Sequence, residues 1–199
     1  MNDILEQFMR DRQSEVYEEK RTAGHDSITA QVFPRVSALL PAGAKVLDVG
    51  CGQGNALELF KRAGFDAIGI ALNERDVEVC RGLGYAVAHC DQNDLSRFDN
   101  EMFDLVWARH VLEHSVAPFW TLHEFSRVAK LGAILYVEVP APETACAHES
   151  NPNHYSVLCL PMWFSLIERS GFTVESGTEI QLNTAAGPDK YWSLICRKN

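Results

Sequence analysis

Several common signatures are missing from this sequence, and each absence disfavours a class of protein. No apolar run reaches the roughly 20 residues that a membrane-spanning helix needs. The six cysteines include no C-x-x-C pair, which favours reduced structural thiols over a zinc site or a disulfide framework. Residues 1–6 lack the basic segment and apolar core of a signal peptide. We therefore expect a cytoplasmic protein with no membrane partner.

Blocks of positive charge are missing as well. The 199 residues carry 18 Lys and Arg against 27 Asp and Glu, a formal net charge of −9. An acidic protein has little long-range attraction for a phosphate backbone. We therefore expect no nucleic-acid partner, and the sequence leaves a homodimer open. The length suits one domain with a sizeable core.

The chain is organised around residues 45–57. The apolar run Val46 to Val49 predicts a buried strand, and a helical pattern resumes after Gly50, Gly52 and Gly54. Glycines let the backbone approach a ligand closely, and the unpaired N–H groups of the following helix face that ligand. The spacing G-x-G-x-G differs from the dinucleotide fingerprint, which disfavours an NAD-dependent oxidoreductase.

Short apolar strands alternate with helices along most of the chain, which predicts a doubly wound α/β sheet. We expect strands at 46–49, 66–70, 85–90, 104–108 and 133–139, and helices at 27–40, 56–63, 74–83, 117–129 and 161–170. Gly132 is expected to close the helix at 117–129. Two final strands, 172–182 and 191–197, are separated only by a turn-rich segment and should pair antiparallel.

At the glycine stretch the sequence V-L-D-V-G-C-G-x-G resembles the class I S-adenosylmethionine-dependent methyltransferases, and the resemblance runs from about Val36 to Lys198. It implies a Rossmann-like, mostly parallel sheet with an antiparallel C-terminal hairpin, over 27–199. It also implies an amphipathic arm or lid at 1–26, where Tyr17 would contact the substrate. The methionine end of S-adenosyl-L-methionine would lie at the matching positions Asp48, Gly50, Gly52 and Gly54.

The chain departs from this family after its second strand. The family carries an acid there that accepts hydrogen bonds from the ribose hydroxyls, whereas this chain has Ala71. Asn73 or Glu74 could take over that contact, although Glu74 suits the first turn of a helix equally well. The alternative is a degenerate cofactor-binding protein that regulates a partner.

The third and fourth strands end in further candidates. The resemblance implies that Asp91 takes the adenine amino group, with Gln92 and Arg109 beside the cofactor. A plain turn role is the alternative for Asp91.

The run from His110 to His114 has three interpretations. It matches the H-x-x-E-H zinc pattern, and two histidines four residues apart share a helix face. No third ligand is evident, however, so we expect no metal. Glu113 and His114 could instead brace the loop. The third interpretation follows from the resemblance: a histidine at the position of His114 deprotonates the acceptor in relatives that act on phosphoethanolamine. We predict His114 as general base, since the histidine pKa lies near working pH, and His110 as a substrate contact.

The segment from 140 to 155 is long, polar and poorly periodic, which is typical of a substrate-binding loop. Its candidates for substrate binding are His148, His154 and Tyr155, although capping and packing roles are equally compatible. The run Asn153-His154-Tyr155 is similar to stretches in family members that act on sugars and other small polar molecules. The resemblance thus implies methyl transfer to an oxygen or nitrogen of a small polar acceptor.

Overall fold

The structure is a computed structural model that describes residues 23–199, so Tyr17 and the expected arm up to residue 22 lie outside the described residues. The strands are β1 (Lys45–Val49), β2 (Asp66–Ala71), β3 (Ala86–His89), β4 (Phe103–Arg109), β5 (Ala129–Pro140), β6 (Phe172–Thr184) and β7 (Gly187–Lys198). The helices are α2 (Ala23–Ser37), α3 (Asn55–Arg62), α4 (Glu74–Gly82), α5 (Pro118–Val128) and α6 (Leu160–Arg169), with 3-10 turns η1 (Leu112–His114) and η2 (His148–Ser150).

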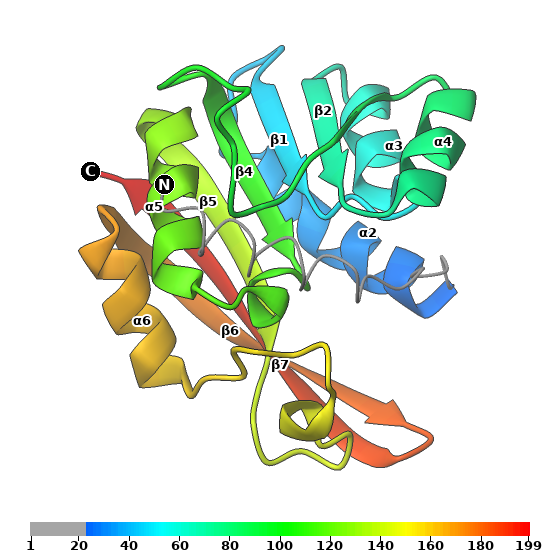
Figure 1. The fold of residues 1–199 in the computed structure, drawn as a ribbon, viewed down its shortest axis with the longest axis vertical. Coiled ribbons are helices and arrows are strands. Elements are labelled where there is room, and N and C mark those ends of the chain that lie inside the picture. Colours follow the sequence, from blue (N-terminus) through cyan, green and yellow to red (C-terminus); the bar gives the residue numbers. More distant parts are fainter. Residues whose placement is uncertain (1–22) are drawn as a thin grey trace, which may run out of the picture.

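The strands form one seven-stranded sheet in the order β3-β2-β1-β4-β5-β7-β6 (Figure 1). The strands from β1 to β5 pair in parallel. β7 is antiparallel to β5, and β6 is antiparallel to β7. The expected Rossmann-like doubly wound sheet with an antiparallel C-terminal hairpin is confirmed.

Helices cover both faces of this sheet. α5 and α6 pack on one face through buried residues such as Phe125 and Trp163. α2 and α3 pack on the other face, where Phe60 is completely buried. Successive side chains of β4 point to opposite faces of the sheet. Val106 packs in the core with Phe125 and Trp163, and Trp107 packs in the core with Phe60. A central strand that is apolar on both faces is what a parallel sheet requires.

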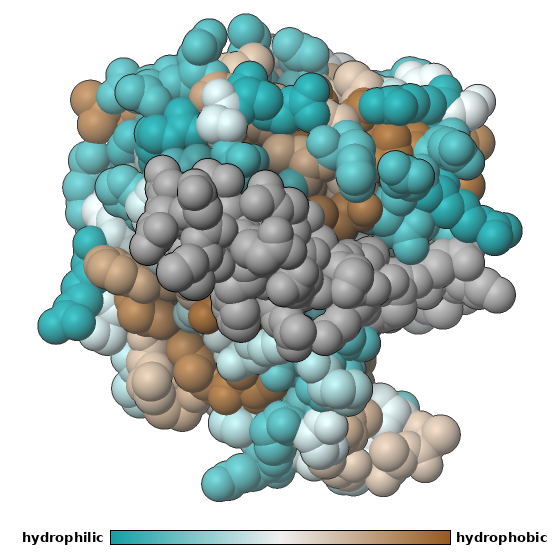
Figure 2. Space-filling view, in the orientation of Figure 1, coloured by the Kyte–Doolittle hydropathy of each residue, from teal (hydrophilic) through white to brown (hydrophobic). Residues whose placement is uncertain are grey.

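Part of the apolar surface stays exposed on the face that carries α5 and α6. Phe119, Trp120 and Met162 are each about half exposed, and Figure 2 shows apolar surface over this part of the molecule. No helix within residues 23–199 has the length and apolar character to span a bilayer.

The junction between α5 and β5 differs from the sequence-based expectation. The helix ends at Val128 and β5 begins at Ala129, with no loop between them. Ala129 is completely buried and pairs with Phe103 of β4, after which the register shifts. Gly132 therefore lies inside the strand with φ 74° rather than closing the helix. The left-handed glycine absorbs a bulge and lets one long strand begin directly at the helix end.

The terminal hairpin is longer than expected. β6 and β7 pair from Phe172 opposite Lys198 to Thr184 opposite Gly187, so only residues 185–186 form the turn. The segment 183–190 was expected to be a loop because it is rich in turn residues. It instead forms the tip of a two-stranded ribbon that projects beyond the rest of the sheet (Figure 1). Pro188 is tolerated there because the ribbon tip has no further strand to receive an N–H bond.

Phe60 gives the clearest test of this packing. Its ring meets the rings of Phe33, Phe65 and Trp107 edge-on at centroid distances of 5.2, 6.1 and 5.6 Å. We expect Phe60→Ala to lower the free energy of unfolding by about 3–5 kcal/mol, measured by urea denaturation. Phe119→Ala removes the same ring from a position that is 49% exposed, and should cost no more than about 0.5 kcal/mol. Equal losses would contradict the packing described.

Candidate functional site

The glycine loop after β1 has the backbone that the sequence predicts. Gly50, Gly52 and Gly54 have φ values of 65°, 47° and 89°, all left-handed. A Cβ at Gly50 would overlap the Val111 side chain, whereas a Cβ at Gly52 would enter open space. Gly50 is thus required by packing within the protein, and Gly52 leaves room that a ligand can fill.

Two thiols hold the carbonyl of this loop. The Cys80 Sγ donates to the Gly52 oxygen at 3.2 Å, and the Cys51 Sγ lies 3.7 Å from the same oxygen. The hydrogen bond between the two thiols, together with burial, raises the pKa of Cys51. That bond lowers the pKa of Cys80. α4 is thereby fastened to the loop through one carbonyl.

Asp48 lies at the carboxyl end of β1 and is 3% exposed. Its Oδ2 atom has no hydrogen-bond partner among residues 23–199. Burial raises the pKa of this carboxyl, the nearby Cys80 adds to the shift, and the Arg109 charge opposes it. A buried carboxylate oxygen beside an open glycine cradle fits a ligand that brings its own hydrogen-bond donor. The residues present therefore fit the methionine end of the expected cofactor.

Ala71 ends β2, Asn73 and Glu74 come shortly after it, and each has a structural role. Ala71 is 6% exposed and belongs to an apolar cluster. The Asn73 Oδ1 accepts the Arg75 backbone N–H at 2.9 Å and so caps α4. Glu74 is exposed in the first turn of that helix, which agrees with the alternative that it only stabilises the helix start. A ribose contact by Asn73 or Glu74 stays a prediction.

Asp76 is a buried carboxylate that the sequence reasoning missed. It is 4% exposed, and its Oδ1 accepts the Gln53 Nε2–H at 3.4 Å from the glycine loop. Asp76 stands three residues after the capping Asn73, a position where an acid is ordinary capping chemistry. Asp76 becomes a candidate for the site only in the folded structure, where its side of α4 faces the glycine loop and contacts Gln53.

The loop after β3 is tied to the loop after β4. The Asp91 Oδ1 accepts both the backbone and the side-chain N–H of Asn93, each at 2.8 Å. The Gln92 Nε2 donates to the Val111 carbonyl at 2.8 Å. The Oδ1 of Asp91 therefore stabilises the turn, as the structural interpretation of this residue expects. Adenine binding by Asp91 and Gln92 stays a prediction. Asn93 also accepts the Ser115 hydroxyl at 3.0 Å, a contact that the sequence did not indicate.

Arg109 and His110 converge on Glu138, a residue that the sequence analysis did not consider. The Glu138 Oε1 lies 2.8 Å from the Arg109 Nε and 2.8 Å from the His110 Nε2. Burial would raise the pKa of Glu138, but His110, Arg109 and the Tyr136 hydroxyl together lower it. His110 has φ 55° and stacks on Tyr191 with ring centroids 4.4 Å apart. The cofactor role of Arg109 and the substrate role of His110 stay predictions.

His110 and His114 do not share a helix face. η1 spans only Leu112–His114, and the left-handed His110 sends its ring to Glu138. The four-residue spacing predicts a shared face only within a continuous helix, which β4 and its turn interrupt.

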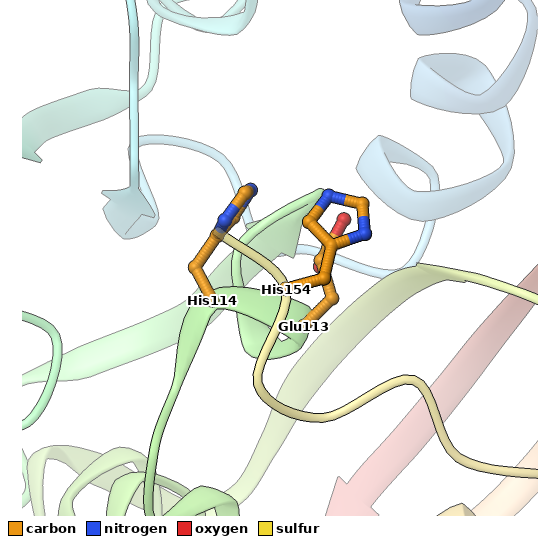
Figure 3. A group of neighbouring side chains, drawn as sticks. All are labelled: Glu113, His114 and His154. Carbon is orange, nitrogen blue, oxygen red and sulfur yellow. The ribbon is translucent and has the colours of Figure 1, made fainter. Parts of the chain in front are cut away.

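His114 instead meets residues from the loop at 140–155. A ring nitrogen of His114, a ring nitrogen of His154 and a carboxylate oxygen of Glu113 all lie within 4.8 Å of one another. Figure 3 shows the His114 and His154 rings on either side of a common space, with the Glu113 carboxylate behind His154. The two rings meet edge-on at a centroid distance of 4.8 Å. We call these three residues the Glu113–His114–His154 cluster.

Hydrogen bonds set the tautomer of both rings in this cluster. The His114 Nδ1 lies 2.8 Å from the Asn153 carbonyl, and the His154 Nδ1 lies 3.0 Å from the His148 carbonyl. A carbonyl only accepts, so each Nδ1 carries a hydrogen. Burial, His114 and His148 lower the pKa of His154 to about 4, so this ring is neutral at neutral pH.

The other two loop candidates support the cluster from outside. The His148 Nε2 lies 3.0 Å from the Asp189 Oδ1 of β7, and its ring stacks on His154 at 5.6 Å. Tyr155 donates its backbone N–H to the Glu113 carbonyl at 2.8 Å, and its side chain is 40% exposed. Their predicted contacts with substrate stay predictions.

Comparison with known proteins places the chain among enzymes. Residues 17–180 match a family model described as a methyltransferase domain. The 27-O-demethylrifamycin SV methyltransferase of Amycolatopsis mediterranei is 25% identical over 202 residues, covering 92% of this chain and 74% of that protein. The ubiquinone biosynthesis O-methyltransferase of Hahella chejuensis is 35% identical over 105 residues, covering 50% of this chain and 44% of that protein.

The fold has close structural neighbours. A putative methyltransferase from Bacillus halodurans superimposes with a TM-score of 0.74 at 17% sequence identity, covering 86% of this chain and 99% of the other. At that identity the likeness shows the fold alone.

Gly52 provides a direct test of the glycine cradle. We expect Gly52→Val to abolish binding of S-adenosylmethionine in a calorimetric titration, because the branched side chain would fill the open space. Gly64→Val is the matched control, because Gly64 also has a left-handed φ, 78°, and open space around its Cβ. The control should lose stability but bind the cofactor as wild type does. Unchanged affinity in Gly52→Val would refute the cradle.

Proposed function

Because the chain belongs to the class I S-adenosylmethionine-dependent methyltransferases, we propose that it transfers a methyl group to an oxygen or nitrogen of a small polar molecule. One observation carries the proposal. The open cradle at Gly52 follows β1, and Glu113 and His114 follow the neighbouring strand β4, both at the carboxyl ends of the strands. His154 joins them from the loop after β5. Ligands of open α/β sheets bind at this edge.

The cofactor supplies an electrophilic methyl group on a positively charged sulfur. Asp48 offers a buried carboxylate oxygen to its methionine end, and Gly52 leaves the space for it. Ala71 stands where the family has the acid that binds the ribose. We propose that Asp76, held beside the glycine loop by Gln53, takes over this role. Asp91 and Gln92 would receive the adenine.

The acceptor would lie against the Glu113–His114–His154 cluster. The His114 ring is oriented by its Nδ1–H, which donates to the Asn153 carbonyl, and we propose that its Nε2 assists removal of the acceptor's proton. Holding nucleophile, methyl carbon and sulfur in line supplies most of the acceleration in such a displacement, so few catalytic side chains are needed. The relatives named as O-methyltransferases favour an oxygen acceptor.

A second candidate function keeps the cofactor site without catalysis. Ala71 favours it, because the ribose hydroxyls would lose a charged acceptor at that position. The buried carboxylate of Asp76 favours the enzyme instead, because it returns an acid to the same region from the next helix.

Asp76 separates these two candidates. We expect Asp76→Asn to weaken S-adenosylmethionine binding by about 1–3 kcal/mol, the range for losing a hydrogen bond to a charged group, in a calorimetric titration. Glu78→Gln, an exposed acid on the same helix, should leave affinity unchanged. A degenerate protein would behave in the opposite way: wild type would bind poorly and Ala71→Asp would improve it.

Methyl transfer itself is tested by product formation. We expect wild-type protein to release S-adenosylhomocysteine when it is given S-adenosylmethionine and a panel of small hydroxylated and amino compounds. Gly52→Val should release none above background. Tight cofactor binding without turnover of any hydroxyl or amine acceptor would refute the proposed reaction.

A further inference from the structure

Three different metal-binding side chains meet where the loop after β5 lies against the tip of the β6–β7 hairpin. The Cys146 sulfur, a ring nitrogen of His148 and a carboxylate oxygen of Asp189 all lie within 4.8 Å of one another. Thiolate, imidazole and carboxylate are the ligand types that Zn²⁺ takes in proteins. No spacing in the sequence predicts this group, because His148 and Asp189 stand 41 residues apart.

The distances within this group suit a single ion. The His148 Nε2 lies 3.0 and 3.1 Å from the two Asp189 oxygens. Ligand atoms at about 2.0–2.3 Å from a tetrahedral Zn²⁺ lie roughly 3.3–3.6 Å apart, so this pair already has nearly the required separation. A carboxylate only accepts, so the Nε2 hydrogen lies between the two groups, where the ion would replace it. The Cys146 Sγ has to approach by no more than about an ångström to join them.

The backbone holds the two halves of the group together before any ion binds. Ala145 donates its backbone N–H to the Pro188 carbonyl at 3.1 Å. These two residues are the chain neighbours of Cys146 and Asp189. A Cβ at Gly187 would lie 2.8 Å from the Ala145 Cβ, so glycine permits this close approach. Figure 1 shows the short turn of the loop (yellow) against the ribbon formed by β6 and β7.

Ala147 lies between two of the ligands in a left-handed conformation, with φ 47°. A residue with a Cβ adopts this conformation at some cost, and it persists where the surrounding contacts determine it. Here it lets η2 begin at His148, whose ring reaches back to the hairpin at Asp189. Asp189 is 5% exposed, and a buried carboxylate is stabilised by a nearby cation.

We infer that Cys146, His148 and Asp189 bind one Zn²⁺ ion that fastens the loop after β5 to the hairpin. Binding displaces one proton from the Cys146 thiol and one from the His148 Nε2, and both pass to solvent. The fourth coordination position is left for water or for the Thr184 hydroxyl, which lies 3.2 Å from the Cys146 Sγ. The inference assigns His148 to the ion instead of to the substrate.

The ion has a consequence for the acceptor side, and this consequence rests on the proposed function. The His148 carbonyl accepts the His154 Nδ1–H at 3.0 Å, and the two rings stack with centroids 5.6 Å apart. An ion that fixes His148 therefore also fixes His154, which belongs to the cluster proposed to face the acceptor. We expect Zn²⁺ to lower the KM for the acceptor and to leave the affinity for S-adenosylmethionine unchanged.

Cobalt reports ligation by a thiolate without any need for activity. Full-length protein, purified without a histidine tag, stripped with a chelator and kept reduced with a phosphine, is titrated with Co²⁺. A cobalt–thiolate bond gives a charge-transfer band in the near ultraviolet, and we expect this band to saturate at one Co²⁺ per chain. Cys146→Ser should remove the band. Cys159→Ser is the matched control, because Cys159 is an exposed thiol outside the group, and should keep it.

Calorimetric titration with Zn²⁺ tests the other two ligands. His148→Gln and Asp189→Asn should each weaken binding at least about 100-fold, since loss of an outer partner of a ligand alone costs about 10–100-fold. His123→Gln is the control, because His123 is exposed on α5 and should change nothing.

A measurement on wild-type protein covers the case in which a variant fails to fold. Iodoacetamide labelling, read by peptide mass spectrometry, should modify both Cys146 and Cys159 in metal-free protein. One equivalent of Zn²⁺ should protect Cys146 and leave the labelling of Cys159 unchanged. Equal labelling of Cys146 with and without Zn²⁺, or a cobalt band that survives in Cys146→Ser, would overturn the inference.

The failure of this inference and the failure of the proposed function have different signatures. Stoichiometric Zn²⁺ binding that depends on Cys146, in a protein that transfers no methyl group, would support the site and refute the function. Methyl transfer by a protein that gives no cobalt–thiolate band would refute the site and leave the methyltransferase intact.

Discussion

One buried carboxylate, Glu138, determines the direction in which the chain leaves β4. Its side chain binds Arg109 and His110, and its backbone carbonyl accepts the His110 N–H at 2.8 Å. These contacts hold His110 in a left-handed conformation that a non-glycine residue adopts at some cost. η1 follows at once, so the positions of Glu113 and His114 depend on an acid of the next strand, β5.

The rest of the site is assembled on η1 through its backbone. Tyr155 and Ser156 both donate to the Glu113 carbonyl, and the Ser156 hydroxyl donates to the Ser115 carbonyl at 2.7 Å. The loop after β5 is thus held against the turn after β4 although it has little regular structure of its own. Such main-chain contacts define where His154 lies without demanding a particular sequence around it.

The sequence predicts most of the sheet because its signals are local. An apolar run, three glycines and a helical period each fall within one short segment, and the glycine loop has the conformation those residues imply. The His114–His154 meeting depends on the fold, because the two residues stand far apart in the chain and no local period relates them. Asp76 was missed because an acid in the first turn of a helix already has an ordinary local explanation. Its contact with Gln53 of the glycine loop is created only by the fold. The hairpin length was missed because turn residues signal a bend but not how far pairing continues.

The position of β7 has a consequence for how the protein is made. β7 is the last strand in sequence, yet it lies between β5 and β6 in the sheet. During synthesis β5 emerges well before its partner, and until β7 arrives its backbone groups on that side are an open template for other chains. Completion of the sheet therefore waits on the docking of a hairpin made late, a non-local pairing that folds slowly. Nascent chains of this fold are most vulnerable to aggregation along β5, a strand that the finished protein buries completely at its centre.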